Sequence, residues 1–259
     1  MTETGKIVDL THFLENNKHW APWWVRNVVK YRDHKHGKLA VRLVFGLPSR
    51  YLKTRLGWAL EYIKMSTHGV THLDAPWHYG PVSNGKRSRT IDEVPLEWCF
   101  SDGVVLDLRH KRDGEEVGVN DLKAALLKIG YTIKPMDIVL VHTGNDRSGY
   151  GTGEYFTKGS GVSAEATMWI VDQGVKVVGI DSWTWGLPLS VEAARAKKSG
   201  RNDIFWASHY VGLEKEYCHL EQLTNLDKLP PFGFKISCFP LKVKNGSGGP
   251  ARVVAIIDE

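Results

Sequence analysis

The sequence predicts an α/β fold with a mixed β-sheet in a single domain of 259 residues. From Val104 onward, short β-branched runs alternate with helix-like segments, a pattern typical of strands joined by crossover helices. Near the end of the chain, two strand-like runs flank a glycine-rich turn. Such a turn between apolar runs predicts a β-hairpin that closes the sheet.

The expected elements follow from local signals along the chain. The predicted strands are 7–10, 104–108, 137–141 and 175–181, followed by a hairpin of 234–240 and 251–257 across the turn 246–250. A helix over 120–128 is expected to be capped by Asn120 or Asp121. A second helix over 164–173 is expected to be capped by Ser163, whose hydroxyl can accept from a free backbone N–H.

Residues from about 15 to 60 form a long Trp- and Arg-rich insertion, with some helix expected around 49–60. Long insertions tend to be binding loops. The stretch 26–42 is locally basic and lies beside three tryptophans, a combination that could bind single-stranded nucleic acid. A single basic run is common on surfaces, so we favour a solvated insertion that covers a pocket or a partner subunit.

Composition excludes several classes of protein. The chain is 42% hydrophobic and 24% charged, which argues against disorder, and its net charge of +5 is mild. Its apolar runs are far shorter than the ~20 residues of a membrane span, and no secretory signal is visible. Cys99, Cys218 and Cys238 show no CxxC spacing and are expected to be buried free thiols, with His219 pointing away from its neighbour Cys218. We therefore expect a cytoplasmic protein.

Chemically active side chains concentrate between residues 67 and 78, where His68, His72, Asp74 and His78 occur. On an extended strand His72, Asp74 and His78 would point to one face, and the first two could reach a common ion. Gly69 offers a turn through which His68 can fold back. Imidazole and carboxylate together suit Zn²⁺, Mn²⁺ or a similar divalent ion.

The spacing H-x3-H-x-D-x3-H resembles the metal motif of the cyclase family, which includes bacterial kynurenine formamidase and isatin hydrolase. Further segments are similar to that family's opening, to its strand ending in Gly-Ile-Asp and to its terminal hairpin: 7–12, 174–181, 240–242 and 249–252. His209 and Glu221 lie twelve positions apart and match the family's second pair of metal ligands. The resemblance covers nearly the whole chain outside the insertion.

The resemblance implies a swivelling β/β/α architecture in a homodimer, with two divalent ions per chain. One ion would be held by His68, His72 and Asp74, and the second by Asp74, His209 and Glu221. His78 would be the proton-transfer residue. Glu214 and Glu216 are alternatives to Glu221.

The expected activity is hydrolysis of an amide-type C–N bond, in an arylformamide or an isatin-like lactam, by metal-activated water. The same ions could serve a lactone hydrolase or a dehydrating cyclase, and a non-enzymatic nucleic-acid-binding protein is a distant alternative. Trp77 lies within the motif and Trp183 follows a predicted strand, so either ring could bind a small aromatic or heterocyclic substrate. Each ring could equally well pack in the core or in a dimer interface. We expect neither nucleic acid nor a membrane as partner.

Overall fold

The computed structural model describes residues 5–257 and divides into two compact units. The larger unit comprises the described residues up to 13 and from 67 onward, and the smaller comprises 14–66. The insertion expected at 15–60 falls within the smaller unit. One domain carrying an insertion stays a prediction.

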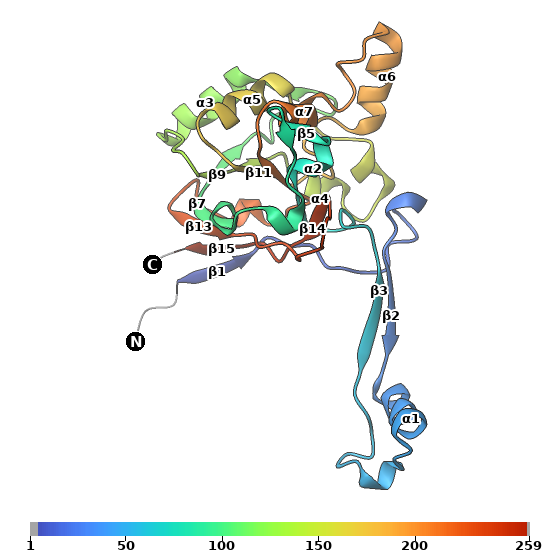
Figure 1. The fold of residues 1–259 in the computed structure, drawn as a ribbon. Helices are drawn as coiled ribbons and strands as arrows, with labels where there is room; N and C mark the ends of the chain where they lie inside the picture. Colours follow the sequence, from blue (N-terminus) through green and yellow to red (C-terminus); the bar gives the residue numbers. More distant parts are fainter. Residues whose placement is uncertain (1–4, 258–259) are drawn as a thin grey trace. The chain divides into compact units, whose positions relative to one another are not determined.

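The larger unit is built on a mixed sheet that has nine strands within the described residues, in the order β1-β15-β13-β7-β9-β11-β12-β4-β14 (Figure 1). Its strands are β1 Lys6–Asp9, β4 His72–Asp74, β7 Phe100–Asp107, β9 Ile138–His142, β11 Val177–Ile180, β12 Cys218–Glu221, β13 Phe234–Ser237, β14 Gly248–Pro250 and β15 Val254–Ile257. The four neighbours β7, β9, β11 and β12 are parallel, and the other pairs are antiparallel. The mixed α/β fold is therefore confirmed.

The central parallel strands are buried on both faces, which explains their nearly continuous apolar sequence. Every residue of Ile138–His142 and of Val177–Ile180 is buried. The strands predicted at 104–108, 137–141 and 175–181 are confirmed, with bounds shifted by a few residues.

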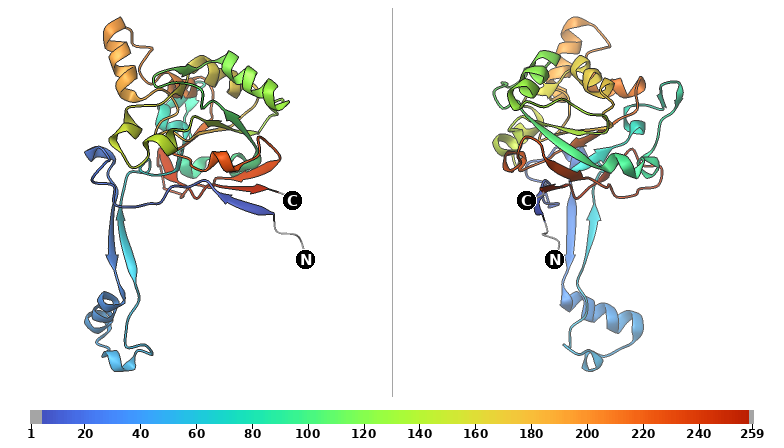
Figure 2. Two further views of the ribbon diagram at one scale, coloured as in Figure 1. Left: turned by 180° about the vertical axis from the view of Figure 1, so that it is seen from behind. Right: turned by 90° about the vertical axis from the view of Figure 1, so that its left-hand side faces the viewer.

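Helices α3 (Val119–Ile129) and α5 (Ala164–Asp172) cover one face of the sheet, and both views in Figure 2 show them on the same side. Their apolar stripes pack on β7, β9 and β11 through buried Leu122 and Ile170. The predicted cap of α5 is confirmed, because the Ser163 hydroxyl accepts from the Ala166 N–H at 3.1 Å.

The predicted cap of α3 at Asn120 or Asp121 is wrong. The N-cap is Gly118, and the Asp121 carboxylate reaches back to accept from the Gly118 N–H at 2.8 Å. Asp121 therefore acts from inside the first turn, as the reciprocal half of a capping box, rather than as the cap itself.

The helix predicted around 49–60 is also wrong. In the smaller unit the helix is α1 (His34–Phe45), whose cap Asp33 accepts from two backbone N–H groups, and only a single 3-10 turn forms at Ser49–Tyr51. The backbone at Gly57 lies so close to Gly37 of α1 that a β-carbon there would be 2.2 Å from a backbone carbon. Strands β2 (Val28–Arg32) and β3 (Leu60–Lys64) pair antiparallel beside α1.

The predicted terminal hairpin is confirmed as an antiparallel pair, with Ile236 opposite Ala255. The turn expected at 246–250 is not a simple turn, however. Its last residues form β14, which pairs with β4 at the opposite edge of the sheet from β1. The Ser247 carbonyl accepts from the Ala75 N–H at 2.9 Å, so this connection is tied to the segment after β4.

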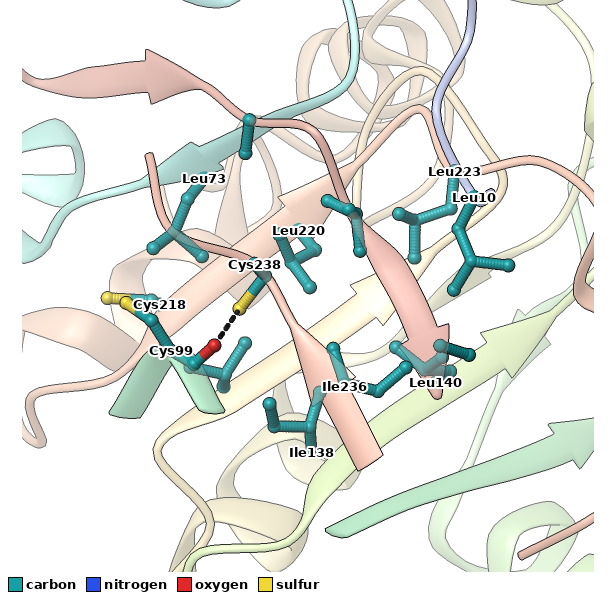
Figure 3. Close-up of a cluster of buried hydrophobic side chains, with 14 of the residues drawn as sticks. Leu10, Leu73, Cys99, Ile138, Leu140, Cys218, Leu220, Leu223, Ile236 and Cys238 are labelled. Atoms are coloured by element: carbon teal, nitrogen blue, oxygen red, sulfur yellow. Dashed lines mark hydrogen bonds between the residues drawn. The ribbon is translucent and has the colours of Figure 1, made fainter. Parts of the chain in front are cut away.

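The second face of the sheet is covered by the sheet itself, which curls so that β13 and β15 pack against the central strands. Figure 3 shows the resulting core, in which Ile236 and Cys238 face side chains such as Leu140 and Leu220. Layers of strand, strand and helix result, as the β/β/α expectation requires. The three cysteines are free and buried, as predicted.

One of the remaining helices has 11 residues, and the other remaining helices and strands have two to five. They are α2 Pro76–Tyr79, α4 Asn145–Gly149, α6 Leu189–Ser199, α7 Ala207–Tyr210, β5 Val82–Ser83, β6 Lys86–Arg87, β8 Glu116–Val117 and β10 Gly161–Val162. Among residues 5–257, none of the helices has the length and apolar character that crossing a membrane would need.

Partly buried His12 makes the stability of the larger unit depend on pH. Its ring stacks on Tyr150 at 3.6 Å between centroids, and burial lowers its pKa from 6.5 to about 4 against the opposing charge of Asp146. The folded state therefore binds fewer protons than the unfolded state between pH 4 and 6.5. This contribution to stability is lost as the pH falls through that window.

We expect His12→Phe to preserve the stacking and to flatten the dependence of unfolding free energy on pH between 4 and 6.5. Without His12, unfolding takes up one proton fewer in this pH range. The slope of unfolding free energy against pH is then smaller by up to ~1.4 kcal/mol per pH unit. Urea unfolding at a series of pH values measures this slope. An unchanged slope in the variant contradicts the assignment to His12.

Candidate metal centre

Two short strands of similar sequence place the chemistry on one face of the sheet. Strand β4 reads His72-Leu73-Asp74, and β12 ends in His219-Leu220-Glu221. The strands pair antiparallel, with His72 opposite Glu221 and Asp74 opposite His219. Because side chains alternate along a strand, Leu73 and Leu220 enter the apolar core while the four polar side chains share the other face. Each histidine thus faces a carboxylate.

His68 is folded back onto this face by the connection before β4. Its Nδ1 lies 2.7 Å from Asp74 Oδ1, and its Nε2 lies 3.0 Å from the Ser247 hydroxyl. Gly248 leaves room for the ring, because a β-carbon at that position would lie 2.6 Å from His68 Cε1. The Gln222 side chain donates to the His68 carbonyl at 3.0 Å and fixes the backbone. His68 is therefore positioned by two distant residues: Gly248 in strand β14 and Gln222, which follows β12.

His209 enters the cluster from helix α7, and its Nε2 lies 3.3 Å from Glu221 Oε1. The helix begins after Trp206, which has a left-handed backbone (φ 65°) and whose N–H donates to buried Glu192 at 2.8 Å. The Trp206 ring stacks on His209 with centroids 4.8 Å apart. A second N–H, that of Trp185, donates to Glu221 Oε1 at 2.8 Å.

The hydrogen bonds of His72 orient its ring as a ligand. Its Nδ1 lies 2.7 Å from the Val70 carbonyl, which can only accept, so Nδ1 carries the proton and the lone pair of the neutral ring is on Nε2. That Nε2 lies 3.0 Å from Asp74 Oδ1 and 3.7 Å from Glu221 Oε2, yet makes no hydrogen bond within the described chain. A metal-bound histidine has the same arrangement, with its other N–H donated to a carbonyl.

Electrostatics in the cluster centre on Asp74, which is fully buried. Burial acts to raise the pKa of its carboxyl, but the neighbouring His78, His68 and His72 outweigh burial and hold that pKa well below its usual range. Burial also acts to lower the pKa of His72, and here the Asp74 charge prevails and raises it. The site therefore contains a carboxylate that needs positive charge nearby.

His78 approaches Asp74 from a helix, so the expectation that it shares an extended strand with His72 is wrong. Pro76 begins helix α2, in keeping with the preference of proline for the first helical position. His78 Nε2 lies 3.9 Å from Asp74 Oδ2, and the ring stacks on His68 at 4.1 Å between centroids. Burial lowers the pKa of His78 from 6.5 to about 3, despite the opposing charge of Asp74. His78 is therefore neutral near pH 7.

The donor atoms form two overlapping groups with ligand-like spacing. One comprises Asp74, His209, His219 and Glu221, and the other comprises His68, Asp74 and His78, with donor atoms within 4.8 Å of one another in each group. Both contain Asp74, and His72 Nε2 lies between Asp74 and Glu221. Buried atoms without a hydrogen-bond partner among the described residues include Asp74 Oδ2, His72 Nε2, His209 Nδ1 and His219 Nδ1. Divalent cations fit this donor set because it offers unpaired lone pairs of nitrogen and oxygen.

Sequence reasoning missed two residues of the cluster. It treated His219 only as a neighbour of Cys218, although the repetition of His-Leu-Asp in His-Leu-Glu was a signal for a second liganding strand. Cys218 does point to the opposite face, into the core. Trp206 had no local signal, because only the path of the chain into α7 brings its ring onto His209 and within 5.0 Å of the His78 centroid.

The other candidate residues lie as follows. Trp77 is partly exposed at the start of α2, and the Trp183 ring meets Phe156 edge-on at 5.0 Å. Of the carboxylates considered as alternatives to Glu221, Glu216 pairs with Arg89, and Glu214 is exposed. Glu221 is thus the one that lies in the cluster.

A separate buried group is formed by His142, Asp146 and Asp181 at the ends of β9 and β11. Burial, together with the charge of Asp146, raises the pKa of Asp181 to about 7. The Asp181 carboxylate accepts from the backbone N–H groups of Thr143 and Gly144, so it also fixes the turn after β9.

Comparison with known families shows a match to the family described as "Putative cyclase" over residues 8–186, more than half of the chain. Among curated proteins, cyclase-like protein 3 of Oryza sativa subsp. japonica is 27% identical over 196 residues, 75% of this chain and 64% of the relative. The chain thus spans less than two thirds of that relative's length. The kynurenine formamidase of Erythrobacter litoralis (strain HTCC2594) is 27% identical over 190 residues, 73% of each chain.

Solved structures show the same fold. Isatin hydrolase A from Labrenzia aggregata, bound to benzyl benzoate, superimposes with a TM-score of 0.73 over 99% of this chain and 95% of its own, at 24% identity. Isatin hydrolase A from Ralstonia solanacearum gives a TM-score of 0.74 over 98% and 92%, at 23% identity.

We expect divalent metal to stabilise the protein. A cation that binds only the folded state adds about 2.7 kcal/mol to the unfolding free energy at 100 times its Kd, which raises the Tm of a chain this size by several degrees. Exhaustive chelation should lower the Tm, and added Zn²⁺ or Mn²⁺ should restore it. In Asp74→Ala, which removes the carboxylate common to both donor groups, neither treatment should move the Tm. A chelated parent protein with an unchanged Tm would contradict the metal centre.

Proposed function

This chain belongs to the cyclase family, and we propose that it is a metal-dependent hydrolase that cleaves amide-type C–N bonds. The observation that carries the proposal is the convergence of imidazole and carboxylate lone pairs around buried Asp74, several of them without a hydrogen-bond partner among residues 5–257. The names of relatives and fold neighbours, kynurenine formamidase and isatin hydrolase, support the same reaction type.

Two divalent ions, Zn²⁺ or Mn²⁺, are proposed to share Asp74. His68, His72 and Asp74 would hold the first, and Asp74, His209 and Glu221 the second. Such ions, when bound, polarise a carbonyl and lower the pKa of water from 15.7 towards ~7. The chain's own contribution is a rigid donor set: His72 is fixed by Val70, and Glu221 is fixed by the Trp185 N–H.

His78 is proposed to move the proton. Its side chain is a quarter exposed, whereas Asp74 beside it is fully buried, so the ring lies between the buried donor set and solvent. The ring is neutral near pH 7 because burial lowers its pKa, and it can accept a proton from attacking water without first losing one. Once protonated, the ring can donate the proton to the departing amine nitrogen. Stacking on His68 fixes its orientation.

The substrate is proposed to be an arylformamide or an isatin-like lactam. Trp206 supports an aromatic substrate, because its ring lies against both His78 and His209 and flat rings pack favourably on indole. Trp77 and Trp183 keep their proposed role as substrate contacts.

The protein is further proposed to act in the cytoplasm as a homodimer. Three buried free cysteines suit a reducing compartment. Helix α1 exposes Leu43, Val44 and Phe45, an apolar surface that a second copy could cover. Sedimentation of the intact chain as a monomer would contradict the dimer.

The reaction type is tested by a panel of N-formyl anilines, isatin-like lactams and aryl lactones of matched size. We expect turnover of at least one C–N substrate, its loss on chelation, and its recovery when Zn²⁺ or Mn²⁺ is added back. Release of formate or ring-opened acid measures the rate. Lactone hydrolysis with no cleavage of any C–N substrate would instead support a lactone hydrolase.

We expect His78→Ala to keep its metal and its fold while kcat falls roughly 10²- to 10⁴-fold, the usual contribution of a general acid–base group. KM should change little, because the lost interaction forms in the transition state. Metal analysis and steady-state kinetics measure the two effects, and His110→Ala, at an exposed site, is the matched control. Loss of one ion equivalent from His78→Ala would show that His78 is a ligand instead.

A further inference from the structure

His219 lies in the donor cluster but has no role in the proposed reaction. It lies directly opposite Asp74 in the paired strands and is fully buried. Its Nδ1 lies 3.9 Å from Asp74 Oδ2 and 3.8 Å from Glu221 Oε1. Tyr79 and Trp185 pack around the ring, with centroids 4.9 and 5.3 Å away. A buried histidine usually has a hydrogen-bond partner for each ring nitrogen. In His219 only Nε2 has a partner among the described residues.

A short hydrogen-bond chain determines which nitrogen carries the proton. His219 Nε2 lies 2.7 Å from the Tyr217 hydroxyl, and that hydroxyl lies 2.8 Å from the Ser208 carbonyl oxygen. The carbonyl can only accept, so the Tyr217 O–H donates to it, and the Tyr217 oxygen then accepts from Nε2–H. The reverse arrangement would turn a tyrosine lone pair towards the Ser208 carbonyl. The neutral ring therefore carries its proton on Nε2 and its lone pair on Nδ1.

In this tautomer three hydrogen-bond acceptors face one another: His219 Nδ1 and the carboxylates of Asp74 and Glu221. The Nδ1 lone pair points towards the carboxylates of Asp74 and Glu221, and Nδ1 and Asp74 Oδ2 both have no hydrogen-bond partner within the described chain. A shared proton cannot bridge them, because separations of 3.8 and 3.9 Å exceed the length of a hydrogen bond. Buried acceptors in this arrangement repel one another unless a cation lies between them.

We infer that His219 Nδ1 is a further ligand of the second ion, which would then be held by Asp74, His209, His219 and Glu221. This inference rests on the proposed metal-dependent function. Four protein donors of two imidazoles and two carboxylates make a closed site of the kind that Zn²⁺ occupies structurally. His68, His72 and Asp74 would give the first ion only three protein donors, which would leave room there for water or substrate. The second donor set would then serve mainly to stabilise the cluster, and the first would supply the Lewis-acid chemistry.

The test compares the affinity of each ion in three proteins: the intact chain, His219→Ala and Tyr217→Phe. Zn²⁺ is removed by a chelator of known affinity while the ions bound per chain are counted, and Co²⁺ absorption reports the coordination of the tight site. We expect the intact chain to hold one ion more tightly than the other. His219→Ala should no longer bind this tighter ion, and added imidazole should restore its binding by occupying the space that the side chain left. Tyr217→Phe keeps the His219 imidazole but removes the hydroxyl oxygen that orients it. This variant should bind the tighter ion with roughly 10- to 100-fold lower affinity.

The outcomes separate this inference from the proposed function. Two ions bound with unchanged affinities in His219→Ala would overturn the inference and leave the proposed function intact. An intact chain that binds no divalent ion would overturn both. If His219→Ala fails to fold by circular dichroism, Tyr217→Phe decides, and an unaltered Zn²⁺ affinity and Co²⁺ spectrum in that variant would overturn the inference.

Discussion

The cluster depends on the burial of one negative charge, that of Asp74. A carboxylate removed from water is costly unless cations or donors surround it, and Asp74 is fully buried on β4, between β12 and the edge strand β14. Besides His72 on the same strand, histidines approach it from four other parts of the chain: the connection before β4, helix α2, helix α7 and strand β12. Each of these segments is placed by packing elsewhere in the fold, so the geometry around Asp74 is a consequence of the whole larger unit.

Packing and chemistry are coupled through the alternation of side chains in β4 and β12. Leu73 and Leu220 are both fully buried in the core that the curled sheet encloses (Figure 3). The burial of these two leucines also fixes which way the flanking donor side chains point, because a slip of one residue would send every donor to the other face. Because the apolar core is close-packed, it leaves the donor side chains little freedom to move. Stability and the donor set cannot be varied independently at these strands.

Regular local patterns made much of the fold predictable. The buried strands β9 and β11 and the helix capped by Ser163 follow from apolar runs and a capping residue. The H-x3-H-x-D pattern located the cluster, and the resemblance to a family added His209 and Glu221. The pairing of Gly248–Pro250 with β4 is a long-range contact and was not predictable. The helical turn carrying His78 was missed although Pro76 at its first position is a local signal. Helix α1 was missed although Asp33 is a local N-cap signal, because the segment that follows mixes a basic first half with an apolar second half that stays largely exposed.

Anomalous X-ray diffraction from crystals grown with Zn²⁺ or Mn²⁺, recorded on both sides of the metal absorption edge, tests the central claim most directly. The claim is that Asp74 is the carboxylate shared by two divalent ions. The account predicts two anomalous peaks on the face of the sheet shared by His72 and Glu221, with one Asp74 oxygen bound to each ion. No peak at Asp74, or peaks only at the separate group around Asp181, would contradict it.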